Sequence, residues 1–364
     1  MIQKNLAPMV SEAAQLLTQL ISIPAISREE GTKADFIEKY LHKCGANPHR
    51  CLNNIWCVQP DNGRPTLLLN AHIDTVRPVS GWKRSPFAPT IEGECIYGLG
   101  SNDCGGGLVT LMLTYLSLRS SALPWRLVFL ASAEEEVSGT NGIRAVLPHL
   151  PNIDVAIVGE PTGMRPAIAE KGLMVLDCTT YGQAGHAARE EGDNAIYKAL
   201  DDILWFRSHQ FSRISPLLGP VKMSVTMINA GNQHNVIPDE CHFVVDVRSN
   251  ECYSNLELLS EIKRNVQCEV KPRSTRLGSS GISPAHPIVQ AAVRLGGEAY
   301  GSPTLSDQAL MPFPSFKMGP GQSSRSHTAD EFIRLSELSE ALRIYHALLH
   351  TESHPVPMTN EFPN

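Results

Sequence analysis

Short apolar runs alternate with helix-like segments through the first 160 residues, and this alternation constrains the fold more than any other feature. Three runs have the length and content of buried strands, at 66–71, 126–131 and 155–158. Segments with a helical repeat or a helix-length apolar run lie around them, at 9–20, 34–44 and 105–118. Strands that are separated by helices favour an α/β sheet with buried, parallel central strands.

The pattern changes near Lys171. Strand and helix patterns then follow one another in the order β-α-β-β-α-β, at 173–181, 194–207, 222–229, 241–248, 254–265 and 267–272. This is the order of the ferredoxin-like, split-βαβ motif, a compact unit that can be inserted into a larger domain. We expect a Ser/Gly-rich linker, a helix, a Pro/Gly-rich loop and a last helix after it, at 274–284, 287–299, 312–323 and 335–349.

These boundaries predict two domains and a tail. We expect the first domain to comprise residues 1–171 and 279–350, the inserted domain 172–278, and a frayed tail 351–364. A chain of 364 residues gives each of two domains enough length to bury a core.

Charge and composition exclude several classes of partner. A net charge of −6 and an aromatic content of 6% do not suit a nucleic-acid-binding surface. No apolar run approaches the roughly 18 residues of a membrane span, and the N-terminal segment predicts an amphipathic helix rather than a signal peptide. The nine cysteines are odd in number and lack a CxxC pair, which favours a reducing cytoplasm.

Acidic residues and one histidine follow the three predicted strands. His72 and Asp74 follow the first strand, the triplet 134–136 the second and Glu160 the third, while Asp103 lies in a glycine-rich loop before a helix. In an open α/β sheet, ligands bind in the crevice beyond the carboxyl ends of the strands. Carboxylates that converge there repel one another and need a cation. Carboxylate with imidazole, and no thiolate in the set, suits zinc, cobalt or manganese.

Five motifs in a fixed order carry a resemblance to a known family: HIDT at 72–75, GLGSND at 98–103, EEE at 134–136, GEPT at 159–162 and GPGQSSRSHTADEF at 319–332. Together they resemble the co-catalytic zinc metallopeptidase and deacylase family of acetylornithine deacetylase, succinyl-diaminopimelate desuccinylase and carboxypeptidase G. The resemblance covers about residues 10–350. It implies an α/β, zinc-peptidase-like catalytic domain with a mixed, largely parallel sheet, interrupted by a ferredoxin-like α+β dimerisation domain, and hence a homodimer.

The resemblance also implies two divalent metal ions, zinc or alternatively cobalt, and their ligands: His72 and Glu160 on the first ion, Glu136 and His327 on the second, and Asp103 bridging both. Asp74 is similar to the family's carboxylate that orients the ligand imidazole of His72.

The glutamate triplet leaves two registers open, because the family has a Glu-Glu pair in which the first residue is the general base and the second a ligand. The pair is either Glu134 with Glu135 or Glu135 with Glu136. The following segment, VSGTNG, favours the second register. Glu135 is then expected to take a proton from the attacking water and give it to the leaving amine.

Three residues of the inserted domain resemble family positions that act on the substrate. His186, in GQAGHAARE, is similar to the histidine that stabilises the oxyanion from the neighbouring subunit. Asn235 and Arg248, in NVIPDECHFVVDVR, are similar to a polar substrate contact and a clamp for the substrate α-carboxylate. The chain departs from many relatives at Gly105, where they have lysine, and in AAREEG, which lacks their proline.

The resemblance and Glu160 favour a deacylase that acts on a small N-acyl amino acid, with N-acetylornithine, in arginine biosynthesis, as the expected substrate. Succinyl-ornithine or succinyl-diaminopimelate is an alternative within the same chemistry. A dipeptidase or carboxypeptidase is a further alternative. A catalytically inactive binding module is disfavoured because every expected ligand type and the base are present.

Overall fold

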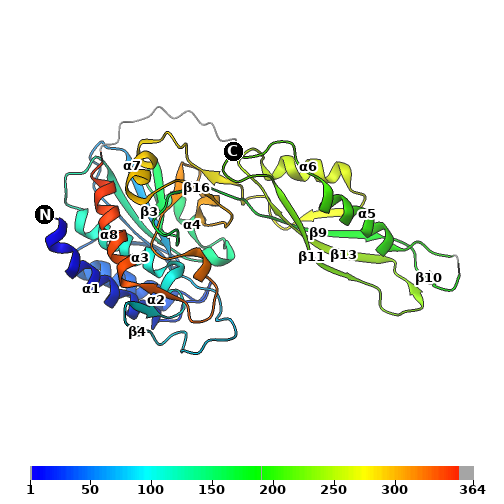
Figure 1. Cartoon of the computed structure of the whole chain (residues 1–364), viewed down its shortest axis with the longest axis horizontal. Helices are drawn as coiled ribbons and strands as arrows, with labels where there is room; N and C mark the ends of the chain where they lie inside the picture. Colours follow the sequence, from blue (N-terminus) through cyan, green and yellow to red (C-terminus); the bar gives the residue numbers. More distant parts are fainter. Residues whose placement is uncertain (1, 190, 352–364) are drawn as a thin grey trace. The chain divides into compact units, whose positions relative to one another are not determined.

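The computed structural model describes residues 2–189 and 191–351, and it divides them into two compact units (Figure 1). The first unit comprises 2–168, 281–300 and 306–351, and the second 169–280 and 301–305. The second unit is therefore inserted in the sequence of the first. Of the expected tail, residues 352–364 lie outside the described residues.

A mixed sheet forms the centre of the first unit. Its strands lie in the order β1 (His49–Cys51), β2 (Asn54–Val58), β6 (Arg126–Ser132), β3 (Thr66–His72), β7 (Val155–Val158), β17 (Ser315–Lys317) and β8 (Ala167–Glu170). Strands β6, β3, β7 and β17 run parallel to one another, whereas β1 pairs antiparallel with β2, β2 with β6, and β8 with β17. The predicted mixed, largely parallel sheet is confirmed.

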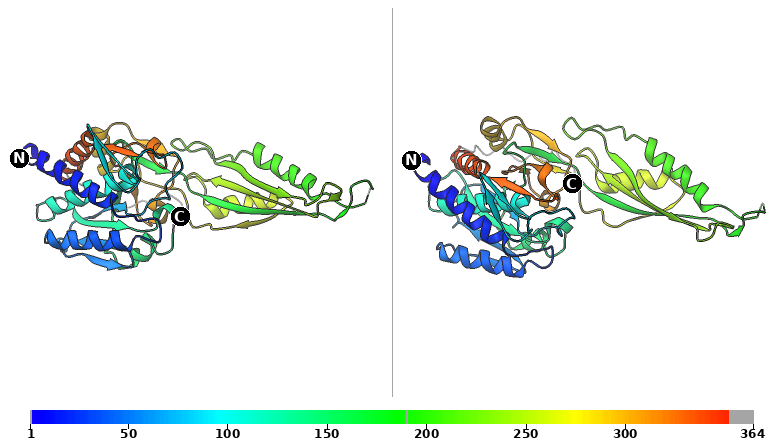
Figure 2. Two further views of the ribbon diagram at one scale, coloured as in Figure 1. Left: turned by 90° about the horizontal axis from the view of Figure 1, so that it is seen from below. Right: turned by 60° about the horizontal axis from the view of Figure 1, so that its bottom comes forward.

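Helices cover both faces of this sheet (Figures 1 and 2). One face packs against α1 (Ile2–Ile21), α2 (Gly31–Lys43), α3 (Gly106–Leu118), α7 (Pro287–Gly296) and α8 (Leu335–Leu349), and the other against α4 (Ile143–Val146). Along β3, Leu67 and Leu69 enter the first of these cores and Leu68 enters the second. Both faces of the strand are thus buried, which explains its continuous apolar sequence.

Helix α3 is buried almost all round, and its start lies against the end of β7. A side chain at Gly107 would place its Cβ 1.8 Å from the carbonyl oxygen of Gly159. Only glycine permits this close approach. This contact between Gly107 and Gly159 holds the loop that precedes α3 beside the residue that follows β7.

Several short strands were not predicted from the sequence. The segment 312–323 was predicted as a loop, but it contains β17. This strand was missed because three residues are too few to show a strand repeat. A small sheet in the order β18 (Phe332–Arg334), β5 (Cys95–Tyr97), β4 (Thr90–Glu92) was also missed. Two further short strands of the central sheet are β15 (Ser280–Gly281) and β16 (Tyr300–Ser302).

The second unit is an antiparallel sheet with two helices on one face. The strand order is β11 (Lys222–Ala230), β13 (Glu240–Arg248), β9 (Met174–Tyr181), β14 (Glu269–Pro272), and the helices are α5 (Ala195–Ser208) and α6 (Asn255–Asn265). Alternate residues of β9 are buried, as expected for a sheet covered on one face. This is the ferredoxin-like arrangement that the element order predicted.

A short two-stranded antiparallel sheet lies at one end of the second unit. Strand β10 (Gly185–His186) pairs antiparallel with β12 (Val236–Ile237), and the backbone N–H of Ala187 donates to the carbonyl of Asn235 at 3.0 Å. Two segments about fifty residues apart in sequence are thereby held together.

None of the described helices is both long enough and apolar enough to cross a bilayer.

Candidate metal centre

Seven of the candidate residues gather in the first unit at the carboxyl ends of its parallel strands. His72 ends β3 and Asp74 follows it, Glu135 and Glu136 follow β6, Glu160 follows β7, Asp103 lies in the turn before α3, and His327 follows β17. The strand ends meet at one edge of the sheet, which is where an α/β fold places its ligand site.

The carboxylate of Asp103 lies between two histidines. Its Oδ1 is 3.2 Å from Nε2 of His72, and its Oδ2 is 3.5 Å from Nε2 of His327. On the far side of His327, Oε2 of Glu136 lies 2.9 Å from the same Nε2. On the side of His72, Oε1 of Glu160 lies 3.7 Å from Nε2. One carboxylate with an oxygen toward each of two donor groups is the arrangement that a bridging ligand requires.

Asp74 holds both the imidazole of His72 and the backbone of the glutamate pair. Nδ1 of His72 is 3.0 Å from the carbonyl oxygen of Asp74 and 3.5 Å from its Oδ1. The carboxylate of Asp74 also accepts the backbone N–H groups of Glu135 and Glu136 at 3.0 and 3.1 Å, and the hydroxyl of Ser27 at 2.7 Å. A hydrogen on Nδ1 leaves the lone pair of Nε2 facing the acidic cluster.

Only two members of the glutamate triplet enter the cluster. The carboxylate of Glu134 accepts the backbone and side-chain N–H groups of Asn141 at 3.3 and 2.9 Å. Oε2 of Glu135 instead lies 3.9 Å from Nε2 of His72. The side chains of Glu135 and Glu136 therefore face the two histidines, whereas that of Glu134 faces Asn141.

The buried carboxyls of the cluster are hard to ionise. Burial, with the nearby charge of Asp103, raises the pKa of Glu160 to about 8. Burial also raises the pKa of Glu136, and that of Glu135 well above its usual value. Oε1 of Glu160 is buried and has no hydrogen-bond partner among the described residues. A cation would supply what these groups lack, since it favours their ionised forms and fills their free lone pairs.

Neighbouring carboxylates raise the pKa of both histidines. The hydrogen bond to Glu136 raises the pKa of His327 to about 9. Burial alone would lower the pKa of His72, but Cys104 and the carboxylates of Asp103 and Asp74 raise it well above its usual value. Imidazole and carboxylate donors in two overlapping groups fit a pair of divalent cations.

Glu331, which is only 2% exposed, was not predicted from the sequence. Its Oε1 accepts the backbone N–H groups of Asn102 and Asp103 at 2.8 and 2.9 Å, and its Oε2 accepts that of Gly100 at 3.1 Å. Glu331 therefore fixes the turn that presents Asp103. The one available signal was its position in the last family motif, four residues after His327.

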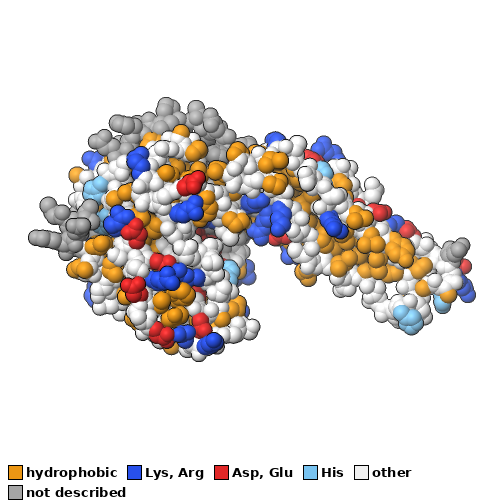
Figure 3. All heavy atoms as spheres, viewed as in Figure 1, with side chains coloured by type: hydrophobic (Ala, Val, Ile, Leu, Met, Phe, Trp, Pro, Cys, Tyr) orange, Lys and Arg blue, Asp and Glu red, His pale blue; other side chains and the backbone are white. Residues whose placement is uncertain are grey.

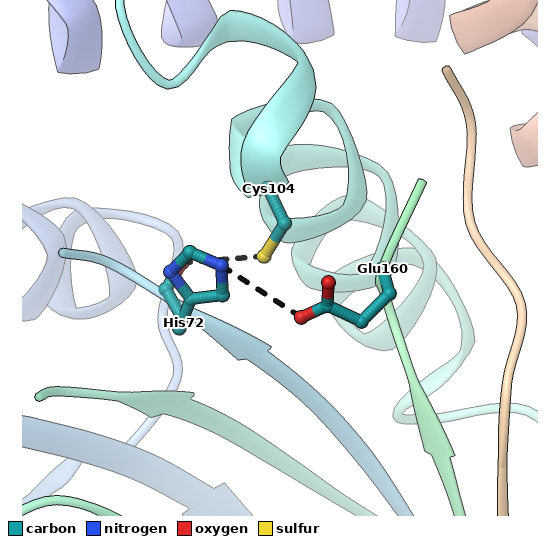
Figure 4. Close-up of side chains that lie close together, drawn as sticks. All are labelled: His72, Cys104 and Glu160. Carbon is teal, nitrogen blue, oxygen red and sulfur yellow. Dashed lines mark hydrogen bonds and ion pairs between the residues drawn. The ribbon is translucent and has the colours of Figure 1, made fainter. Parts of the chain in front are cut away.

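Cys104 was not predicted from the sequence either. Its Sγ, a nitrogen of His72 and a carboxylate oxygen of Glu160 all lie within 4.8 Å of one another (Figure 4). Burial raises the pKa of this thiol to about 12. Its place directly after Asp103 in the sequence was the only signal.

The other three candidates lie in the second unit, at two opposite ends of it. His186 and Asn235 are exposed and lie together at the β10–β12 pairing. Arg248 lies at the far end of β13, where its Nε and Nη2 donate to the carboxylate of Asp246 at 2.7 and 3.0 Å. Eight residues of strand, roughly 27 Å at about 3.4 Å per residue, separate Arg248 from the start of β13.

A model of peptidase family M20/M25/M40 matches residues 68–351. The chain belongs to this family. Over 92% of its length it is 25% identical to a succinyl-diaminopimelate desuccinylase of Sphingopyxis alaskensis, 97% of which is covered. Over 88% it is 27% identical to an acetylornithine deacetylase of Proteus mirabilis, 92% of which is covered.

A solved M20 structure has the same fold. The Bacillus subtilis YXEP protein, described as a dinuclear metal binding peptidase, matches 96% of this chain and 100% of its own with a TM-score of 0.72 at 17% identity. The family resemblance inferred from the five motifs is confirmed. As an M20 member, the protein is a metallohydrolase that acts on amide bonds, and the family's substrates are small acylated amino acids and peptides.

Proposed function

We propose that the protein is a two-metal deacylase that releases a free amine from an N-acyl amino acid. The observation that carries the proposal is the position of Asp103, with one oxygen toward His72 and the other toward His327. The clustering of the other acidic groups on either side of Asp103 supports it.

The donor groups divide into two sets around Asp103. His72 and Glu160 would hold a first cation, and Glu136 and His327 a second, with Asp103 shared. We propose zinc for both, with cobalt as the alternative, because imidazole and carboxylate donors suit these ions. When bound, such cations lower the pKa of water and polarise a carbonyl.

Glu135 is the proposed general base. It lies at the edge of both donor sets, and none of its side-chain atoms has a hydrogen bond among those found in the described residues. Its carboxylate would accept the proton of the attacking water and then transfer it to the leaving amine nitrogen. Asp74 would keep Glu135 in place, because its carboxylate accepts the backbone N–H of this residue.

For the acyl group and side chain we propose N-acetylornithine, as the family's deacetylases suggest. Succinyl-diaminopimelate is the second candidate, because a relative of that name aligns over 97% of its length. Arg248 would bind the α-carboxylate of either substrate. Asp246 occupies two of the five N–H donors of Arg248, which leaves three for a ligand.

We further propose a homodimer formed through the second unit. Strand β11 is an edge strand, and its Met227 and Ile228 are 64% and 56% exposed. Tyr197 and Leu204 on α5 are also exposed. Figure 3 shows hydrophobic side chains gathered on this unit. An unpaired edge with apolar side chains calls for a covering partner, and two-fold pairing with a second copy supplies one.

The positions of His186 and Arg248 also support a dimer. The two residues lie at opposite ends of a long strand pair, too far apart to contact one small substrate from the same unit. In a dimer, His186 and Asn235 would act on the substrate bound by the partner. His186 would donate to the oxyanion of the tetrahedral intermediate.

We place the enzyme in the cytoplasm, since all nine cysteines are unpaired.

The test is amine release from a matched panel of N-acetyl and N-succinyl derivatives of ornithine and diaminopimelate, together with unacylated dipeptides, by the zinc-loaded and cobalt-loaded protein. The Glu135→Gln variant serves as the blank for contaminating hydrolases. We expect N-acetylornithine to give the highest kcat/KM. Preference for a succinyl substrate would change the acyl assignment, and turnover of unacylated dipeptides alone would overturn the deacylase proposal.

A further inference from the structure

A buried thiol faces the proposed first cation site. Figure 4 shows the sulfur of Cys104 turned toward His72 and Glu160. One donor atom from each of these three residues lies within 4.8 Å of the others. This separation is small enough for one cation to contact all three after minor adjustment, since zinc binds nitrogen and oxygen at about 2.0–2.2 Å and sulfur at about 2.3 Å.

The position of the sulfur is set by the same elements that position the ligands. Cys104 is 1% exposed and lies between Asp103 and the start of α3. Its Sγ is 3.5 Å from the carbonyl oxygen of His72, with which the thiol can form a hydrogen bond. The nearby Oε1 of Glu160 is buried and has no hydrogen-bond partner among the described residues. The carboxylate of Glu160 thus has an oxygen without a hydrogen-bond donor in the described part of the chain, and the thiol of Cys104 lies beside it. A cation bound by both residues would satisfy that oxygen.

We infer that Cys104 is a sulfur ligand of the first cation. The inference rests on the proposed two-metal function and deepens it. The first cation would then have one nitrogen, two oxygens and one sulfur around it, from His72, Asp103, Glu160 and Cys104. Cys104 would thus add a thiolate to the ligand set that the sequence predicted.

Binding breaks the S–H bond and forms a metal–sulfur bond. The sulfur keeps the electron pair of the S–H bond and shares it with the cation, and the proton passes to the solvent. No oxidant or reductant takes part. A thiolate makes the first position softer than the second, which has only carboxylate and imidazole donors. The first position should therefore prefer zinc or cadmium over manganese or magnesium, whereas the second should discriminate less.

The competing explanation is that Cys104 is a small buried side chain whose only role is the hydrogen bond to the carbonyl of His72. Absorption of the Co(II)-loaded protein separates the two explanations. A thiolate bound to Co(II) gives a strong charge-transfer band in the near ultraviolet, whereas imidazole and carboxylate ligands give only weak visible bands. We expect this band to grow in the unmodified protein with the equivalent of Co(II) that fills the first site.

Two variants and a matched control complete the test. Cys104→Ser and Cys104→Ala should lose the band and bind the first zinc at least about tenfold more weakly. A tenfold loss of metal affinity is about the lower end of the effect of mutating a residue that only supports a ligand. Cys57→Ser is the control, because Cys57 is also 1% exposed in the first unit and burial also raises its pKa to about 12. Cys57 belongs to no group of candidate ligands among the described residues. This variant should keep the band.

The outcomes separate this inference from the proposed function. Two equivalents of Co(II) bound without the band would overturn the role of Cys104 and leave the two-metal site intact. Persistence of the band in Cys104→Ala would overturn that role as well. Binding of fewer than two equivalents by the unmodified protein would instead count against the two-metal proposal. Because the first measurement uses the unmodified protein, a variant that fails to fold does not remove the test.

Discussion

The buried carboxylate of Glu331 accepts a hydrogen bond from the backbone N–H of Asp103 at 2.9 Å. A residue just beyond the last proposed ligand, His327, thus holds the turn that carries the proposed bridge. The two other N–H groups that Glu331 accepts belong to the same turn. Through these contacts, a substitution of Glu331 would change the binding affinity of both cations.

We predict that Glu331→Gln weakens the binding of both metal ions by about 10–100-fold, the usual effect of losing a group that supports ligands. The amide would turn an N–H₂ group toward one of the backbone donors that now meet a carboxylate. Competition with a chelator, followed by metal analysis, measures the affinities. Unchanged affinity for both ions would contradict the positioning role.

Asp330→Asn is the matched control for that experiment. Asp330 is adjacent in sequence and also accepts two backbone N–H groups, those of Lys83 and Arg84 at 3.1 and 3.0 Å. Neither donor lies in a ligand-bearing segment. The control should therefore bind both ions as the unmodified protein does, with any loss confined to thermal stability.

The glutamate triplet gives a second prediction. Glu135→Gln should lower kcat by about 10²–10⁴, the usual contribution of a general base, with metal content unchanged. Glu136→Gln should lose a metal ion as well, because its carboxylate lies 2.9 Å from His327. Glu134→Gln is the control and should retain turnover, since Glu134 is engaged with Asn141. An inactive Glu134 variant beside an active Glu136 variant would move the pair by one residue.

The third prediction concerns pH. The carboxyl of Glu160 keeps its proton in the folded, metal-free protein up to about pH 8, whereas the usual pKa of a glutamate is 4.5. The folded state therefore binds more protons than the unfolded state in this window, and the stability of the metal-free protein falls as pH rises. The pKa of His327, raised from 6.5 to about 9, acts with the same sign at higher pH.

Metal ions displace these protons, so their stabilising effect should increase with pH. The measurement is the difference in Tm between loaded and metal-free protein, at about pH 6 and about pH 8 under the same metal activity. We expect a larger difference at the higher pH. An equal or smaller difference would contradict the protonation states described for the cluster.

The fourth prediction tests the dimer and the role of His186 together. His186→Ala should lower kcat by about 10²–10³, the usual effect of removing one oxyanion donor, and leave metal content unchanged. Mixing it with Glu135→Ala protein should partly restore activity. In the mixed dimer, the chain with intact Glu135 can use the partner's His186. Absence of recovery after verified subunit exchange would contradict action across the dimer.

Much of this architecture could be predicted from the sequence because it depends on local patterns. The central strands are continuous apolar runs. The sheet therefore determines the positions of the residues at or just beyond the strand ends, such as His72 and Glu160. Strand β17 could not be found in this way, because its three residues carry no repeat. The motifs indicated ligand types but gave no three-dimensional arrangement.

The residues that were missed act through contacts far apart in sequence. Glu331 meets Asp103 across 228 positions, which no periodicity can reveal. Cys104 has no motif of its own, and its relation to Glu160 depends on the close packing of α3 against the end of β7. The motifs that suggested His186 and Arg248 also gave no sign that the two residues lie at opposite ends of the second unit.

The central claim is that Asp103 bridges two cations, and metal titration of the unmodified protein tests it most directly. Protein stripped of metal and titrated with zinc should saturate at about two equivalents, and Asp103→Asn should weaken both sites because each loses one oxygen of the shared carboxylate. Saturation at one equivalent, or an Asp103→Asn variant that retains two tightly bound ions, would contradict the bridging role.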